Sequence, residues 1–361
     1  MPEPETDPWH DFDGHEQVIV AQHDGVRMVV ALHSTVLGPA LGGTRMATYS
    51  DSANPAAAAY GDALRLSRAM TYKNALAGLG HGGGKGVILA DPAVKPRDLL
   101  HAYARLVEGL GGRYVTAGDV GMTVADMDVI GEQCRWTTGR SPEHGGVGDS
   151  GILTAFGVFE GMRASAAAVW GTPDLAGRRV GVIGAGKVGG RLIGHLVQAG
   201  AVVAAVDPSA TARAAVLDAS PEVRFVDAID DLLAEDLDIV SPNALGGFLT
   251  RARAAALRAA LVCGGANNQL AEPAVGDLLA QRGVVYAPDF MVNCGGVIQV
   301  AEELVGCDLD RARAQTARVF ETTARVLARA ASEGVTPVAA AEAEAEDRIR
   351  TALAAAGRPV L

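Results

Sequence analysis

The chain has few of the side chains on which several kinds of active site depend. Its 361 residues include only four cysteines, in no C-x-x-C spacing, so neither a zinc site nor a disulfide framework is expected. The eight histidines form no H-E-x-x-H motif, and no G-x-S-x-G turn occurs, so zinc-protease and serine-hydrolase chemistry are unsupported. We therefore predict no metal site.

Positive charge and long apolar runs are also scarce. The net charge of −11 argues against nucleic acid and anionic membranes as partners, since both need a basic surface. No apolar run reaches the roughly 18 residues of a membrane span. The opening stretch MPEPETDPWHDFDG is acidic and has no apolar centre, which is a poor match to a signal peptide. We expect a globular, cytoplasmic protein.

Lysine is the scarcest charged residue. The 31 basic residues include only four lysines, Lys73, Lys85, Lys95 and Lys187, so arginine supplies most of the positive charge. The pKa of a lysine can be lowered for catalysis, whereas that of an arginine cannot. Lys85 is the second-last residue of the run GLGHGGGKG at residues 78–86. Such a run suggests either a phosphate-binding loop or backbone that closely surrounds a catalytic amine.

The pattern of apolar residues predicts an α/β protein of two domains. Residues 16–34 read as two strands joined at Asp24 and Gly25, a helix begins near Asn54 and Pro55, and a strand ends just before Asp119. After a Gly-rich linker at 141–151, strands and helices alternate, which indicates a parallel sheet covered on both faces. We place the domains at 1–147 and 148–324, with C-terminal helices from about 325 to 361 packing back on the first.

A dinucleotide-binding motif stands at the start of the second domain. Its G-x-G-x-x-G follows the strand RVGVI and opens a helix, and the next strand ends at Asp207. The first glycine would make a tight turn, the second would admit the pyrophosphate, and the third would let helix and strand pack. Asp207 would accept hydrogen bonds from the ribose and repel a 2′-phosphate, which favours NAD over NADP. The motif residues are Gly184, Ala185, Gly186, Lys187, Val188 and Gly189.

Neither Gly-rich segment satisfies the P-loop pattern. Gly181 to Lys187 fits G-x-x-x-x-G-K, but Val188 replaces the hydroxyl that would hold magnesium. In the earlier run, Leu79 stands where the first glycine should be, and Gly86 follows the lysine. We therefore expect the phosphates at 184–189. The glycines at 78–86 would instead leave the backbone without side chains, so that nicotinamide or substrate can lie close beside Lys85.

Seven motifs together resemble one enzyme family. GPALGGTRM, MTYKNALAGL, GGGKG, AGDVG, GAGKVG, GANNQL and VNCGGVIQVAEE are similar to the Glu/Leu/Phe/Val amino-acid dehydrogenases, in the family's order over residues 15–345. The branched-chain members are the most similar. This chain departs at Gly86 (commonly alanine), Met122 (usually threonine) and Cys294. The resemblance implies an N-terminal substrate, catalytic and oligomerisation domain, a doubly wound Rossmann domain that binds NAD, a cleft between them, and a homo-oligomer.

The family's reaction gives each reactive side chain a role. Oxidative deamination moves a hydride from Cα to nicotinamide, adds water to the imine and expels ammonia. By resemblance, Lys73 would bind the α-carboxylate, Lys85 would be the base, its pKa lowered by burial and a neighbouring cation, and Asp119 would transfer protons. The alternatives are that the lysines are surface charges and that Asp119 is a turn residue.

The resemblance also predicts the substrate pocket. Glutamate-selective relatives have a lysine where Leu41 stands and a hydroxyl where Val300 stands, and Ala117 and Val297 match branched-chain enzymes rather than aromatic ones. We therefore expect valine, leucine or isoleucine as substrate, with the 2-oxo acid and ammonia as products. Phenylalanine dehydrogenase and a non-catalytic NAD sensor are the alternatives. Substrate contacts are predicted at Leu41, Gly42, Met70, Ala117, Thr138, Asn268, Val297 and Val300, and further cofactor contacts at Ser150, Thr154, Ala244, Asn267 and Asn268.

Overall fold

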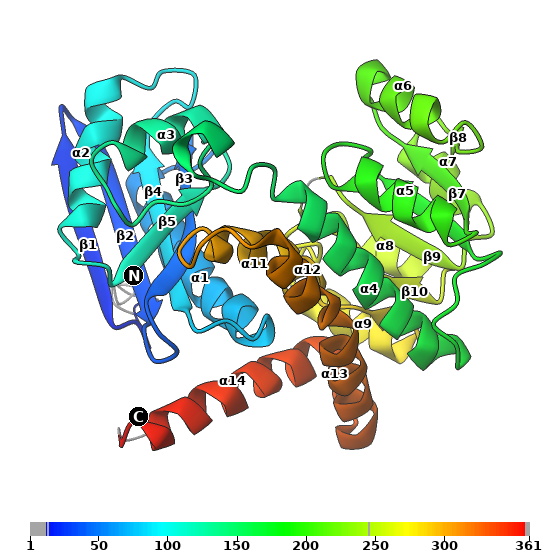
Figure 1. The fold of residues 1–361 in the computed structure, drawn as a ribbon. Coiled ribbons are helices and arrows are strands. Elements are labelled where there is room, and N and C mark those ends of the chain that lie inside the picture. Colours follow the sequence, from blue (N-terminus) through cyan, green and yellow to red (C-terminus); the bar gives the residue numbers. More distant parts are fainter. Residues whose placement is uncertain (1–11, 13, 245, 358–361) are drawn as a thin grey trace, which may run out of the picture. The chain divides into compact units, whose positions relative to one another are not determined.

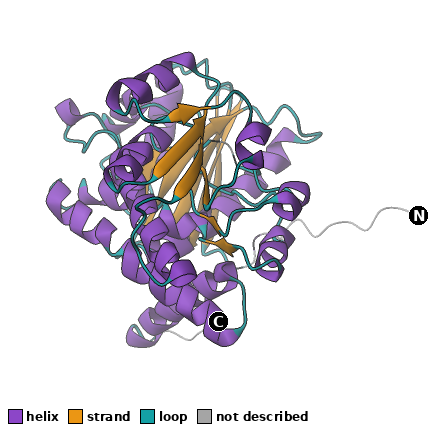
Figure 2. Ribbon diagram, turned by 90° about the vertical axis from the view of Figure 1, so that its right-hand side faces the viewer, coloured by secondary structure: helices purple, strands orange, loops and turns teal. Residues whose placement is uncertain are grey.

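The chain forms two compact units, described in a computed structural model that covers residues 12, 14–244 and 246–357 (Figure 1). The first unit comprises Met1–Asp149, Val300–Leu309 and Glu346–Leu361, and the second comprises Ser150–Gln299 and Asp310–Ala345. Almost all of the acidic N-terminal stretch lies outside the described residues. The prediction of a two-domain α/β fold is confirmed: each unit contains one sheet together with helices, and strands are orange and helices purple in Figure 2.

A five-stranded mixed sheet forms the centre of the first unit, in the order β1-β2-β4-β3-β5. Strand β2 pairs antiparallel with β1 and β4, while β3 runs parallel to β4 and β5. The predicted hairpin is present, with Asp24 and Gly25 at φ +46° and +82°, as a tight two-residue turn requires. The strands are β1 (Gln17–His23), β2 (Val26–Ser34), β3 (Ala40–Ala47), β4 (Gly82–Leu89) and β5 (Tyr114–Gly118).

Helices cover both faces of this sheet because residues of β2 alternate between two cores. Val29 and Ala31 pack with α1 (Pro55–Leu76), whereas Met28, Val30 and Leu32 pack with α2 (Arg97–Glu108) and α3 (Val124–Gly131). Helix α1 begins where the sequence predicts: Asn54 Oδ1 accepts from Ala57 N at 3.2 Å, and Pro55 occupies the first turn.

The second unit is a parallel six-stranded sheet in the order β11-β10-β9-β6-β7-β8. The order reverses beside β6, and this switch point is where doubly wound folds bind ligands. The strands are β6 (Arg179–Ile183), β7 (Val202–Val206), β8 (Arg224–Phe225), β9 (Ile239–Pro242), β10 (Leu261–Val262) and β11 (Val285–Tyr286). The helices along this part of the chain are α4 (Gly151–Trp170), α5 (Gly189–Gln198), α6 (Ala210–Ala219), α7 (Ile229–Ala234), α8 (Arg251–Ala256) and α9 (Ala274–Gln281).

The C-terminal helices are shared between the units. They are α10 (Asp289–Val292), α11 (Gly295–Glu302), α12 (Leu309–Ala317), α13 (Val319–Glu333) and α14 (Pro337–Ala355). Helix α13 packs on α4 and α10 of the second unit. Arg348, late in α14, donates to Leu79 O at 2.7 Å and also to Ala75 O in the first unit. The chain therefore belongs to the first unit at residues 300–309 and again from residue 346, whereas the C-terminal helices were predicted to return to it from about residue 325.

Helix α4 is the one helix in the described part of the chain that is long and apolar enough to cross a membrane. However, 61% of its apolar window is buried, since it packs against α5, α10 and α13 as a core helix does.

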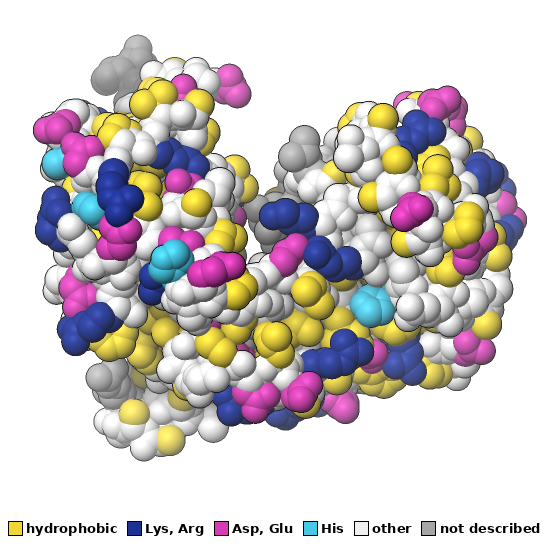
Figure 3. All heavy atoms as spheres, turned by 45° about the horizontal axis from the view of Figure 1, so that its top comes forward, with side chains coloured by type: hydrophobic (Ala, Val, Ile, Leu, Met, Phe, Trp, Pro, Cys, Tyr) yellow, Lys and Arg dark blue, Asp and Glu magenta, His cyan; other side chains and the backbone are white. Residues whose placement is uncertain are grey.

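On the face drawn in Figure 3, acidic and basic side chains are interspersed without a continuous basic area, in agreement with the net charge of −11.

Candidate active site

Lys85 and Asp119, the two residues predicted to be catalytic, are in direct contact. Lys85 lies in the middle of β4 and is 5% exposed. Its Nζ donates to Asp119 Oδ2 at 2.5 Å. Asp119 follows the last residue of β5, and its backbone N–H donates to Thr44 O at 3.0 Å, which fixes it beside β3. A solvated surface lysine does not fit this contact, because Lys85 is buried, and Asp119 is ion-paired in addition to lying in a turn.

The glycines around Lys85 make room for the protein's own core. A Cβ on Gly83 would lie 2.1 Å from Thr71 N of α1, and one on Gly84 would lie 2.7 Å from the Tyr114 ring. A Cβ on Gly86 would lie 2.0 Å from the Tyr103 hydroxyl. We expected these glycines to leave space for nicotinamide or substrate. This expectation is corrected, because helix α1 and the tyrosine side chains occupy that space. The consequence is a tightly packed strand that holds the Lys85 backbone in place.

Two cations flank the Asp119 carboxylate. Besides Lys85, Arg45 Nε of β3 lies 3.2 Å from Asp119 Oδ2. Burial alone would raise the Asp119 pKa, but Lys85 and Arg45 together lower it from 3.8 to about 2. Asp119 is therefore a carboxylate at neutral pH. Neither Arg45 nor its second partner, Asp62, was predicted from the sequence; the available signal was a charged residue within the otherwise uncharged strand β3.

Helix α1 places Lys73 and Met70 on neighbouring positions, three residues apart. Lys73 is half-buried. A Cβ on Gly42 would lie 3.2 Å from Met70 Cγ, so Met70 covers this part of β3. The buried Asn74 side chain donates to Leu41 O at 3.1 Å and fixes the helix on the strand.

Most of the predicted pocket residues lie in the first unit. Leu41 is fully buried in β3, and Ala117 is buried in β5, opposite Gly43. Thr138 is also buried, and its N–H donates to Thr116 O at 2.8 Å. Helix α11 carries the other two: Val300 is buried in the first unit, whereas the half-buried Val297 belongs to the second.

The three glycines of the dinucleotide motif have the three different structural roles that the sequence predicts. Gly184 has φ +90°, a conformation that favours glycine. A Cβ on Gly186 would meet nothing within 4 Å, so the backbone there is open to a ligand. A Cβ on Gly189 would lie 1.9 Å from Gly184 O, so the helix packs directly on the turn. This turn at the start of α5 fits a pyrophosphate.

Asp207 follows the last residue of β7 and lies beside the same turn. Its Oδ2 accepts from Ala185 N and its Oδ1 from Ser209 N, both at 2.7 Å. Each carboxylate oxygen has a further lone pair with which a ribose hydroxyl could bond. Ala244 is exposed beside the turn, with its Cβ 2.9 Å from a Cβ built on Gly184. The exposed Lys187 and the half-buried Val188 complete the loop.

The remaining predicted cofactor contacts fall in two places in the second unit. At the start of α4, Thr154 Oγ1 donates to Ser150 O at 2.9 Å, and a Cβ on Gly296 would lie 2.6 Å from that Thr154 oxygen. After β10, Asn267 Oδ1 accepts from Asn293 Nδ2 at 2.7 Å. Asn268 is exposed, at φ +53°.

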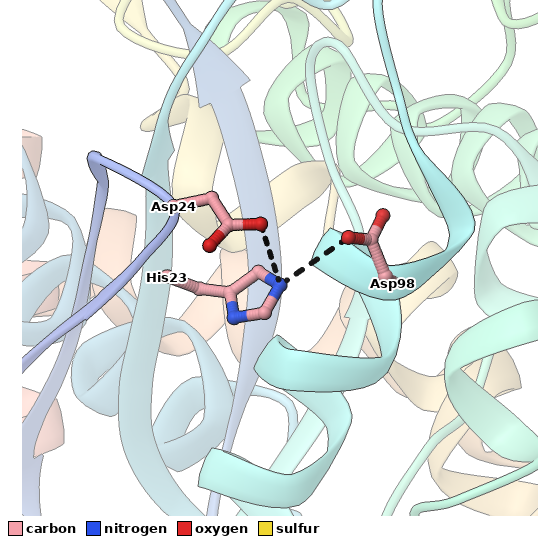
Figure 4. Close-up of side chains that lie close together, drawn as sticks. All are labelled: His23, Asp24 and Asp98. Carbon is pink, nitrogen blue, oxygen red and sulfur yellow. Dashed lines mark hydrogen bonds and ion pairs between the residues drawn. The ribbon is translucent and has the colours of Figure 1, made fainter.

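A separate group of His23, Asp24 and Asp98 has side-chain atoms close enough to hold a metal ion (Figure 4). His23 Nε2 lies 3.7 Å from Asp24 Oδ2 and 3.5 Å from Asp98 Oδ2. The two carboxylates are 82% and 64% exposed, and the group joins the hairpin of the edge strand β1 to the start of α2. Surface contacts between the imidazole and the two exposed carboxylates account for this geometry.

Family models match almost the whole chain. The Glu/Leu/Phe/Val dehydrogenase dimerisation domain matches residues 8–136, and the Glutamate/Leucine/Phenylalanine/Valine dehydrogenase model matches residues 145–357. The chain belongs to this dehydrogenase family. The resemblance of the sequence motifs is thereby confirmed.

Individual relatives agree with this family membership. The chain is 53% identical to a valine dehydrogenase of Streptomyces albus, over 95% of this chain and 94% of that one. It is 43% identical to a leucine dehydrogenase of Bacillus subtilis, over 93% and 91%. Among solved structures, an L-tryptophan dehydrogenase from Nostoc punctiforme superimposes with a TM-score of 0.82 at 36% identity, covering 94% of this chain and 97% of that one.

Proposed function

We propose that this protein is an NAD-dependent dehydrogenase that reversibly deaminates branched-chain L-amino acids. In the forward direction, amino acid, NAD⁺ and water give the 2-oxo acid, ammonium, NADH and a proton. The observation that carries the proposal is the contact between the buried Lys85 and Asp119, since a deaminase must take up and release protons. Similarity to valine and leucine dehydrogenases over nearly the whole chain supports the substrate class.

Each reactive side chain then has one task. Lys73 binds the α-carboxylate of the amino acid and orients its Cα. The dinucleotide, when bound, supplies the hydride acceptor. Lys85 takes a proton from the water that adds at Cα. Asp119 exchanges protons with Lys85 across the 2.5 Å contact and with the leaving amine.

The turn at 184–189 would bind the pyrophosphate, and Asp207 would bind the adenosine ribose. A nicotinamide dinucleotide fits these residues because the Gly186 backbone is open and the turn leads into a helix N-terminus. NAD is proposed over NADP because a 2′-phosphate would lie against the Asp207 carboxylate. Ser150, Thr154, Ala244, Asn267 and Asn268 are proposed as further cofactor contacts.

The proposed substrate pocket is apolar. Leu41 is fully buried and Val300 is 9% exposed, so a glutamate side chain bound against them would leave its carboxylate unpaired, at a cost of several kcal/mol. An aliphatic side chain has no such penalty. We further propose a cytoplasmic homo-oligomer without nucleic-acid or membrane partners; the dimerisation domain supports the oligomer.

A substrate panel tests the proposal. Purified enzyme is assayed for NADH or NADPH formation with L-valine, L-leucine, L-isoleucine, L-phenylalanine, L-tryptophan and L-glutamate. We expect turnover with the aliphatic amino acids and NAD. Turnover confined to aromatic substrates would indicate the phenylalanine-type alternative. Tight NAD binding without turnover of any amino acid would favour the non-catalytic sensor.

A further inference from the structure

We propose that Arg45 is a positioning residue that shares the negative charge of Asp119 and thereby allows Lys85 to release its proton. This inference rests on the proposed function, in which Lys85 acts as a base. Lys85 and Arg45 bind the same carboxylate oxygen: Asp119 Oδ2 lies 2.5 Å from Lys85 Nζ and 3.2 Å from Arg45 Nε. The carboxylate therefore has two cationic partners, of which only the lysine can readily lose a proton.

A second carboxylate fixes the guanidinium. Arg45 Nη1 donates to Asp62 Oδ2 at 2.8 Å, so the planar guanidinium bridges two aspartates from different elements. Asp62 lies on α1 and is 4% exposed. It also accepts from Tyr49 OH at 2.6 Å and from Arg65 Nη2 at 2.5 Å. These bonds compensate the buried charge of Asp62 and hold Arg45 at one distance from Asp119.

The charge balance around Arg45 is set by groups from four segments of the first unit. They are Lys85 on β4, Asp119 after β5, Tyr49 after β3, and Asp62 and Arg65 on α1. Burial alone would lower the Arg45 pKa, but Asp119 and Asp62 raise it above its usual value. Burial and the bond to Asp62 raise the Tyr49 pKa, so this phenol stays neutral. The guanidinium charge is thus permanent.

Removing that charge has a predictable effect on Lys85. Without Arg45, the Asp119 carboxylate is offset by Lys85 alone and holds the ammonium proton more strongly. Arg45 and Lys85 carry like charges, and a nearby like charge disfavours the ammonium form, so removing Arg45 favours that form. The neutral lysine would then form only at higher pH. A purely structural role for Arg45 would instead lower activity by the same factor at every pH.

The test compares pH profiles of kcat/KM for L-valine oxidation with NAD in the full-length enzyme. Arg45→Gln should shift the rising limb to higher pH by about one unit or more, with about a tenfold loss near neutrality that is recovered in alkaline buffer. Arg65→Gln is the matched control, because Arg65 binds the same Asp62 but is 71% exposed. Because this charge is exposed and screened by solvent, its removal should shift the rising limb less than Arg45→Gln does. Arg45→Lys keeps the charge and should shift the limb less than Arg45→Gln does.

An unshifted profile in folded Arg45→Gln, or a loss that is equal at all pH values, would overturn the role of Arg45. If Arg45→Gln does not fold, Arg45→Met, which keeps a stem of similar length, is judged by the same criterion. Inactivity of the wild type with every amino acid would instead refute the proposed function. The two failures are therefore distinguishable.

Discussion

Replacing Gly86 by alanine tests whether internal packing requires the glycines of β4. The added methyl group would lie 2.0 Å from the Tyr103 hydroxyl and 2.6 Å from Thr44 Oγ1, and Tyr103 is completely buried. These two oxygens are 2.5 Å apart, and Thr44 Oγ1 also contacts Thr116 Oγ1, so none can move alone. Overpacking of this kind costs about 1–3 kcal/mol in the free energy of unfolding.

A double-mutant cycle in urea, followed by circular dichroism, identifies the clashing atom. Tyr103→Phe removes the oxygen nearest to the new methyl group, so Gly86→Ala should cost about 1 kcal/mol less in the Tyr103→Phe background than in the wild type. Gly194→Ala in α5 is the control: its Cβ would meet nothing within 4 Å, and helical alanine is favoured by about 0.5–1 kcal/mol. If Gly86→Ala is as stable as the wild type, or if the two substitutions do not couple, the packing argument is wrong.

Three further substitutions test the site. Lys73→Ala should raise KM for the amino acid about 10- to 100-fold, the value of a charge-assisted hydrogen bond, and an effect on kcat alone would contradict its role. Asp207→Ala should lower the NAD over NADP ratio of kcat/KM by about tenfold, whereas an unchanged ratio would exclude the ribose contact. The Asp119 pKa falls from 3.8 to about 2 on folding, so its ionisation stabilises the fold above pH 3.8 and this contribution is lost toward pH 2. The difference in unfolding free energy between the wild type and Asp119→Asn should thus shrink by about 1–2 kcal/mol between about pH 5 and about pH 2, and a constant difference would refute this.

The sequence could predict those parts of the molecule in which a few neighbouring residues determine the backbone conformation. The hairpin turn at Asp24 and Gly25 and the turn at 184–189 each require glycine or tight-turn geometry within a few residues, and the structure has them there. Strands β3 and β4 were not assigned from sequence, because their glycines have low strand propensity. What holds them in the sheet is pairing with β2 and β5 and the packing of α1.

The charge network of the candidate site could not be predicted from the sequence either, because it depends on packing between elements that are distant along the chain. Arg45 and Asp62 meet only because α1 packs beside β3, and Asp119 joins them from the end of a third element. No local pattern records these contacts. The reactive residues Lys73, Lys85 and Asp119 were found through motif resemblance, and their roles stay predictions.

The most direct test of the account is kcat of Lys85→Ala with L-valine and NAD, measured beside the wild type. A general base typically contributes about 10²- to 10⁴-fold, so we predict a loss of that size in a variant that still folds and still binds NAD. A Lys85→Ala enzyme that oxidises L-valine at the wild-type rate would contradict the assignment of Lys85 as the base.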